Sequence, residues 1–254
     1  MRGEAPIVLA LTALLTIVSL LPPGGAAAAA GGAAFALTVI AWKRRAPGAS
    51  SVGLLLVTCL ALALLGFGPQ QAVFGVAFAL YAAVASRVPW FRDATSWQSV
   101  GRLDVRIVAL GAAFAAMSGA TLLLWYVTTR PDLTDLVQTF IPDWPLRLVV
   151  PAALLFCVVN AAVEEAAYRG VLLDALDKAR IKAPAALALQ ALAFAALHFQ
   201  AGVPRGVVGV GLTFVYGLVL GKLCRLAGGL MAPFITHVLT DLVIVTIVLR
   251  LVRT

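Results

Sequence analysis

Long apolar segments separated by short polar ones constrain this chain more than any other feature of its sequence. A helix needs roughly 20 apolar residues to cross a bilayer, within a range of about 17–25. Hydrophobic residues make up 62% of the chain and charged residues 12%, whereas soluble domains are only about 45–50% apolar. We therefore expect an all-α fold, a polytopic transmembrane helical bundle of about 8–9 spans. The candidate spans are residues 6–22, 26–42, 52–68, 71–86, 105–127, 147–168, 184–200, 206–223 and 230–250.

Ionisable residues divide this chain into two regions. Residues 1–144 contain transmembrane segments with little charge inside them, and their function is open. Residues 145–254 carry glutamates, an aspartate and both histidines within apolar segments. Such intramembrane ionisable groups are expensive and usually mark a functional site. The sequence therefore predicts accessory helices over 1–144 and a functional core over 145–254.

Basic residues between the segments predict the orientation of the bundle. If the N-terminus is cytoplasmic, most lysines and arginines fall in cytoplasmic segments, as the positive-inside rule requires. The formal charge of +8 then reflects these flanking residues, and no arginine-rich stretch interleaved with aromatics indicates nucleic-acid binding. Residues 1–21 resemble a signal peptide, but further spans follow at once, so we expect the first helix to be retained. We expect a multi-pass protein of the cell membrane.

Two adjacent glutamates, Glu164 and Glu165, interrupt one of the most apolar segments. Burying neighbouring carboxylates is costly because each is desolvated and the two repel each other. Arg169 lies four residues after Glu165, and residues at this spacing share a helix face. The pair predicts that Glu165 is held in the scaffold by Arg169. Glu164 lies on a different face, towards a cavity, and is the candidate general base.

The only two histidines of the chain lie in the same region as these glutamates. Glu165 and His198 are nearly equally far along the chain from the polar turn at Ile181, so an antiparallel hairpin puts both roughly 24 Å from its tip. His237 and Asp241 share a helix face, which lets the carboxylate orient the imidazole. The spacing predicts one site in the cytoplasmic half of the bilayer. Phe194, one turn before His198, is expected to wall it.

These side chains suit hydrolysis by an activated water. Glu164 with His198 can take a proton from water, and His237 with Asp241 can stabilise a tetrahedral oxyanion. An ionised Asp241 cannot donate a hydrogen bond, so it is either protonated or serves to orient His237.

Two other interpretations use the same residues. Glu164, His198 and His237 could hold Zn²⁺ with an open position, although HExxH is absent. A non-catalytic membrane scaffold or a proton-coupled transporter could also use buried ionisable groups, although no internal repeat supports a transporter.

Three short patterns in the second half resemble the motifs EExxxR, FxxxH and HxxxN/D of the CPBP family: Glu164-Glu165-xxx-Arg169, Phe194-xxx-His198 and His237-xxx-Asp241. This family includes the CAAX prenyl proteases of the Ras-converting type and the bacterial Abi proteins. The resemblance covers about residues 145–250. It implies an intramembrane endopeptidase whose active site opens to the cytoplasmic leaflet.

The resemblance also implies a mechanism. Glu164 and His198 would activate water, and His237 with residue 241 would bind the oxyanion. Family members have been called metalloproteases, but the implied mechanism is glutamate catalysis that requires no cofactor. This chain has Asp, not Asn, at position 241, which leaves a donor role for that residue open.

The expected partners are the lipid bilayer and a membrane-embedded or lipidated peptide or protein. Family members process prenylated CAAX tails, confer immunity to bacteriocins, or are proposed to trim C-terminal sorting tails. The Ala- and Gly-rich composition with more Arg than Lys suggests a bacterial source of high GC content. A eukaryotic-style prenylated substrate is correspondingly less expected.

Overall fold

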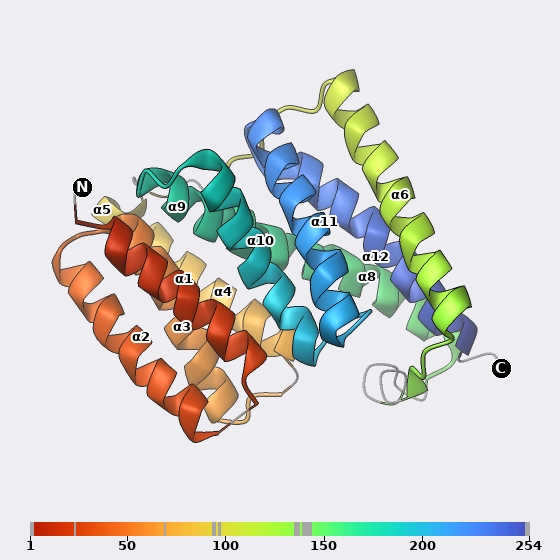
Figure 1. The fold of residues 1–254 in the computed structure, drawn as a ribbon, viewed down its shortest axis with the longest axis horizontal. Coiled ribbons are helices and arrows are strands. Elements are labelled where there is room, and N and C mark those ends of the chain that lie inside the picture. The colour runs from red at the N-terminus through yellow and green to blue at the C-terminus, as the bar shows by residue number, and fades with distance from the viewer. Residues whose placement is uncertain are drawn as a thin grey trace.

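The computed structural model describes residues 3–22, 24–68, 70–92, 95, 98–134, 138 and 144–251, and over these residues it contains helices and no β-strand. Figure 1 shows the helices packed as a bundle. The all-α prediction is therefore confirmed. In chain order the helices are α1 (Ala5–Leu20), α2 (Gly25–Lys43), α3 (Pro47–Leu64), α4 (Gln70–Arg87), α5 (Pro89–Arg92), α6 (Val105–Thr129), α8 (Leu146–Glu165), the π-helix η1 (Ala166–Leu173), α9 (Asp174–Lys178), α10 (Ala183–Gln200), α11 (Gly206–Ala227) and α12 (Met231–Leu251).

Seven of the described helices are long and apolar enough to cross a membrane, with the segment from α8 to α9 counted as one helix. Two shorter apolar helices, Ala5–Leu20 and Gln71–Arg87, coincide with the remaining predicted spans. The chain is therefore a multi-pass membrane protein. The third span begins earlier than predicted, at Pro47 rather than residue 52, because proline is suited to the first turn of a helix.

The helix ends gather at two opposite ends of the bundle. The start of α1, α5 and the turn between α9 and α10 lie at one end, and the end of α12 lies at the other (Figure 1). Hydrogen bonds support the first group: Ala49 at the start of α3 bonds Glu4, and Arg102 before α6 bonds Ala227 at the end of α11. Loops that the sequence assigns to one side of the membrane thus share one end. Which end faces the cytoplasm stays a prediction.

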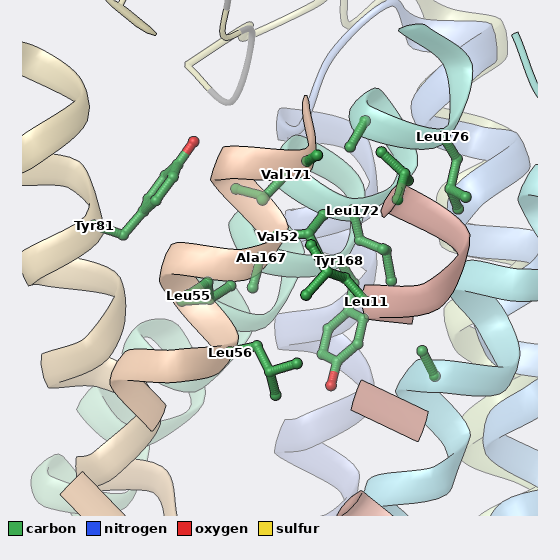
Figure 2. Close-up of a cluster of buried hydrophobic side chains, with 14 of the residues drawn as sticks. Leu11, Val52, Leu55, Leu56, Tyr81, Ala167, Tyr168, Val171, Leu172 and Leu176 are labelled. Atoms are coloured by element: carbon green, nitrogen blue, oxygen red, sulfur yellow. The ribbon is translucent and has the colours of Figure 1, made fainter. Parts of the chain in front are cut away.

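A hydrophobic core joins the N-terminal helices to the segment that follows the two glutamates. Figure 2 shows Leu11 of α1 and Leu56 of α3 beside Tyr168 and Leu172 of η1, and all four belong to one buried cluster. All eight residues of η1 are buried. Residues 1–144 therefore pack directly against the helix that carries the site.

The span predicted at 147–168 continues well beyond its predicted end. Residues Leu146–Lys178 form one helical segment of 33 residues, which is about 50 Å long at 1.5 Å per residue. A hydrocarbon core is only about 30 Å thick. The prediction stopped at Tyr168 because charged residues follow it, but Arg169 is only 2% exposed and stays inside the protein.

The helix changes type directly after Glu165. Residues Ala166–Leu173 form a π-helix, while the backbone on both sides remains in the right-handed helical region. A π-turn fits one more residue into a helical turn and occurs often at functional sites. The change sits between the glutamate pair and the end of the helix, so it sets how Tyr168 and Arg169 face the bundle interior.

Candidate functional site

Glu165 lies at the centre of a buried ionic network. Its Oε1 accepts hydrogen bonds from Arg169 Nη1 at 2.9 Å and from His237 Nδ1 at 2.8 Å. The three side chains are at most 5% exposed. The predicted Glu165–Arg169 pair is present, but Glu165 is more than a scaffold for its own helix, because it also fixes the imidazole on α12.

The other ring nitrogen of His237 faces two further carboxylates. His237 Nε2 lies 3.6 Å from Glu164 Oε2 and 3.5 Å from Asp241 Oδ1. The sequence predicted that Asp241 orients this ring. The shorter contact comes instead from Glu165, on another helix, while Asp241 stands at the opposite nitrogen. Because a hydrogen bond from Nδ1 fixes the plane of the ring, Nε2 is aimed at the space between Glu164 and Asp241.

Asn160 is a site residue that the sequence prediction missed. Its Nδ2 donates to Asp241 Oδ2 at 3.2 Å, which ties α8 to α12. Asn160 lies one helical turn before Glu164, so the two share a face of α8. One signal was available, since Asn160 is the only asparagine in the chain and it interrupts an apolar helix.

His198 is held near the end of α10 by an aromatic ring and a glycine. The ring of Phe194 packs edge-on to His198, with 5.5 Å between centroids, and also contacts His237 at 6.1 Å. Gly202 has φ +93°, and a Cβ there would come within 3.0 Å of His198 Nε2. Phe194 therefore packs against both imidazoles, although it is not among the residues that line the cavity described below, and Gly202 leaves room for the His198 ring.

The four predicted catalytic residues line one cavity of about 370 Å³, together with Asn160 and Gly202. The walls are mostly apolar side chains of α8 and α12, such as Phe156 and Val245. A largely apolar cavity with a few converging polar groups is the usual form of a small-molecule or peptide site. The predicted catalytic residues are up to 77 positions apart in the sequence, and the fold brings them to one place: Glu164, His198, His237 and Asp241.

The N-terminal region also contributes to this site. Gln71 of α4 lines the 370 Å³ cavity and a second cavity of about 250 Å³, which extends between α4 and α8. Glu164 and Asn160 border both cavities. Glu164 therefore stands between two hollows, and a helix from the region expected to be accessory forms part of their wall.

The larger cavity extends away from the α9–α10 turn. Its lining runs along α8 from Glu164 back to Val149 and along α12 from His237 on to Leu249. These directions lead to the end of the bundle where α12 ends (Figure 1). If the N-terminus is cytoplasmic, this end faces away from the cytoplasm. If this cavity is the route to the site, the predicted cytoplasmic N-terminus and the predicted opening to the cytoplasmic leaflet are therefore incompatible.

The predicted alternative metal ligands were Glu164, His198 and His237. Among the described residues, no three His, Cys, Asp or Glu side chains are grouped so that they could hold a metal ion. His237 Nδ1 is bonded to Glu165, so Nε2 is the ring nitrogen that faces the cavity. Catalytic Zn²⁺ takes three protein ligands and an open position, so these three side chains would have to come closer together to hold it.

Residues 145–243 match the family model of the Rce1-like type II CAAX prenyl endopeptidases. This range contains every predicted site residue, from Glu164 to Asp241. No curated protein and no solved structure gives a significant match to the chain. The three motifs lie within the matched residues and converge on one cavity, so the C-terminal region of the chain is similar to the CPBP/CAAX protease family.

Proposed function

We propose that this protein is a glutamate-dependent intramembrane endopeptidase that cleaves peptide bonds of membrane-associated substrates. The observation that carries the proposal is the approach of Glu164, His198, His237 and Asp241 to one cavity among membrane-spanning helices. The family match supports hydrolysis over the alternatives of a scaffold or a proton-coupled transporter. The family description names CAAX prenyl endopeptidases, so a prenylated CAAX tail is tested beside unprenylated and transmembrane peptides, although the composition makes a prenylated substrate less expected.

In the proposed reaction Glu164 removes a proton from water while the water oxygen attacks the scissile carbonyl carbon. The carbonyl π bond breaks, and its electrons form an oxyanion. His198, which lines the same cavity, holds the attacking water by a hydrogen bond. His237 carries protons on both ring nitrogens and donates from Nε2 to the oxyanion, while Nδ1 stays bonded to Glu165. The C–N bond then breaks, and Glu164 returns the proton to the leaving nitrogen.

The proposal can be tested with the full-length protein in lipid nanodiscs. The probes are an internally quenched farnesylated peptide ending in a CAAX sequence, its unprenylated counterpart, and a library of quenched transmembrane peptides. We expect cleavage of at least one probe and loss of about 10³-fold or more with Glu164→Gln, because the carboxylate is the base. Thr121→Ala, on the exposed surface of α6, serves as the control.

Two outcomes would overturn this proposal. One is that Glu164→Ala retains wild-type cleavage, since no base would then have been removed. The other is that no probe is cleaved by either protein. A strong chelator separates the mechanisms: we expect full activity after chelator treatment, and loss that Zn²⁺ restores would replace glutamate catalysis by metal catalysis.

A further inference from the structure

Stabilisation of an oxyanion requires hydrogen-bond donors around the reacting carbonyl oxygen, and removing one such donor typically costs a large factor in kcat. In the site described above, His237 Nε2 supplies one donor. Asp241, its neighbour, has a carboxylate that only accepts when ionised. The position beside His237 therefore lacks a donor unless another residue provides it.

Asn160 has the geometry to be that residue. Its Nδ2 lies 3.2 Å from Asp241 Oδ2, while His237 Nε2 lies 3.5 Å from Asp241 Oδ1. The two oxygens of one carboxylate thus approach the two nitrogens, which brings both nitrogens to the same part of the cavity. Because a carboxylate accepts and an amide nitrogen donates, the pairing fixes the amide with its NH₂ group towards Asp241.

The position of Asn160 on α8 is equally suited to this task. An amide nitrogen carries two N–H groups, and the bond to Asp241 uses one. Asn160 lines the cavity beside Glu164, one turn away on the same helix face. A carbonyl attacked by water held at Glu164 would therefore have the amide of Asn160 and the imidazole of His237 on its oxygen side.

We propose that Asn160 is a catalytic residue that donates one N–H to the oxyanion, and that Asp241 acts by holding the Asn160 amide and the His237 imidazole in place. This inference rests on the proposed function and deepens it. The oxyanion forms when the carbonyl π electrons move to oxygen, and the second N–H of Asn160 bonds it there. The charge disappears when the carbonyl re-forms and the C–N bond breaks.

The test is a double-mutant cycle with steady-state kinetics on whichever probe the wild-type protein cleaves. We expect Asn160→Ala to lower kcat roughly 10²–10³-fold with KM nearly unchanged, because the lost contact exists only in the transition state. Asp241→Asn in the Asn160→Ala background introduces an amide donor at the neighbouring position. We expect the kcat of this double variant to be at least about tenfold above that of Asn160→Ala.

If Asn160 merely braced Asp241, an amide at position 241 would not relieve the loss of kcat in Asn160→Ala. The exchange Asn160→Asp/Asp241→Asn keeps one acid and one amide in contact, and we expect it to be more active than Asn160→Asp alone, which places two acids together. Gln190→Ala is the comparison for a structural amide, since Gln190 donates to Gly217 O at 2.8 Å and holds α10 against α11. We expect Gln190→Ala to lower thermal stability, and we expect no gain in kcat when Asp241→Asn is added to it.

Three results would overturn the inference. The first is a kcat for folded Asn160→Ala within about threefold of wild type, far short of the loss expected for an oxyanion donor. The second is a loss that Asp241→Asn does not relieve although thermal unfolding shows an intact fold. The third is a wild-type protein that cleaves nothing, which overturns the proposed function too, whereas the first two overturn the role of Asn160 alone.

Discussion

Thr12 and Ser51 in the N-terminal half and the site residues in the C-terminal half find their hydrogen-bond partners in different places. In the N-terminal half, the hydroxyls of Thr12 and Ser51 each donate to the backbone carbonyl four residues earlier in the same helix. In the C-terminal half, Asn160 bonds Asp241 and Glu165 bonds His237, so side chains of α8 meet side chains of α12. Both halves are apolar, but among the described residues the network of buried ionic side chains that joins two helices lies in the second half.

The difference shows what buried hydroxyls and buried ionic side chains each require of the neighbouring helices. A hydroxyl that bonds its own helix is satisfied wherever that helix lies, so it places no demand on the neighbours. A carboxylate or an imidazole between two helices is satisfied only when both helices have the right rotation and depth. The C-terminal half therefore depends on its fold for its chemistry, and the N-terminal half supplies packing and walls such as Gln71.

The largest effect should follow from breaking the network at Arg169. Arg169→Ala leaves the Glu165 carboxylate buried with one partner fewer, and we expect a loss of about 3–5 kcal/mol in unfolding free energy. Unfolding in mixed micelles measures it. Lys178→Ala, which breaks the more exposed pair with Asp174, should cost less than about 1 kcal/mol.

A second variant keeps this prediction testable if Arg169→Ala does not fold. Glu165→Gln/Arg169→Met removes both charges, and we expect it to regain much of the stability lost by Arg169→Ala. It should remain far less active than wild type, because the hydrogen bond that fixes His237 changes. Equal stability of the single and double variants would contradict the network.

The next effect should come from Gly202. Alanine at this position would be strained by φ +93° and would press against the His198 ring, so we expect kcat to fall roughly 10–100-fold, as for small misplacements of catalytic groups. Kinetics on the cleaved probe measure the change. Gly206→Ala is the matched control, since Gly206 also has positive φ but a Cβ added there would meet no atom within 4 Å.

A smaller effect, on stability alone, is expected in the N-terminal half at Glu4. Its Oε1 accepts from the backbone N–H of Ala49 at 2.8 Å and so caps the start of α3. Glu4→Ala should cost about 1 kcal/mol of stability, with kcat per folded molecule unchanged. A fall in kcat without a fall in stability would show that the two halves are coupled more closely than their packing indicates.

The smallest effect is expected at Thr12, whose hydroxyl bonds Val8 O within α1. Thr12→Val replaces the hydroxyl by a methyl of similar shape, and we expect less than about 1 kcal/mol, because the backbone carbonyl keeps its helical partner. Thermal unfolding again measures it. A large loss would contradict the view that the Thr12 hydroxyl is satisfied within its own helix.

Local features of the sequence determined the helices and most of the candidate site. Apolar length predicted the spans, and the i, i+4 spacing of Glu165 and Arg169 predicted their ion pair, which the structure contains at 2.9 Å. The turn at Ile181 predicted that Glu165 and His198 reach a common depth, and Glu164, the neighbour of Glu165, lines one cavity with His198. These predictions work because rise per residue and helix periodicity are properties of a single helix.

Tertiary structure alone decided how the helices face one another. The bonds from Glu165 to His237 and from Asn160 to Asp241 join residues 72 and 81 positions apart, and they depend on the rotation of α8 against α12. The wall formed by Gln71 depends on where α4 packs. Spacing within one helix carries no information about these rotations, because they are set by side chains of both helices packing together.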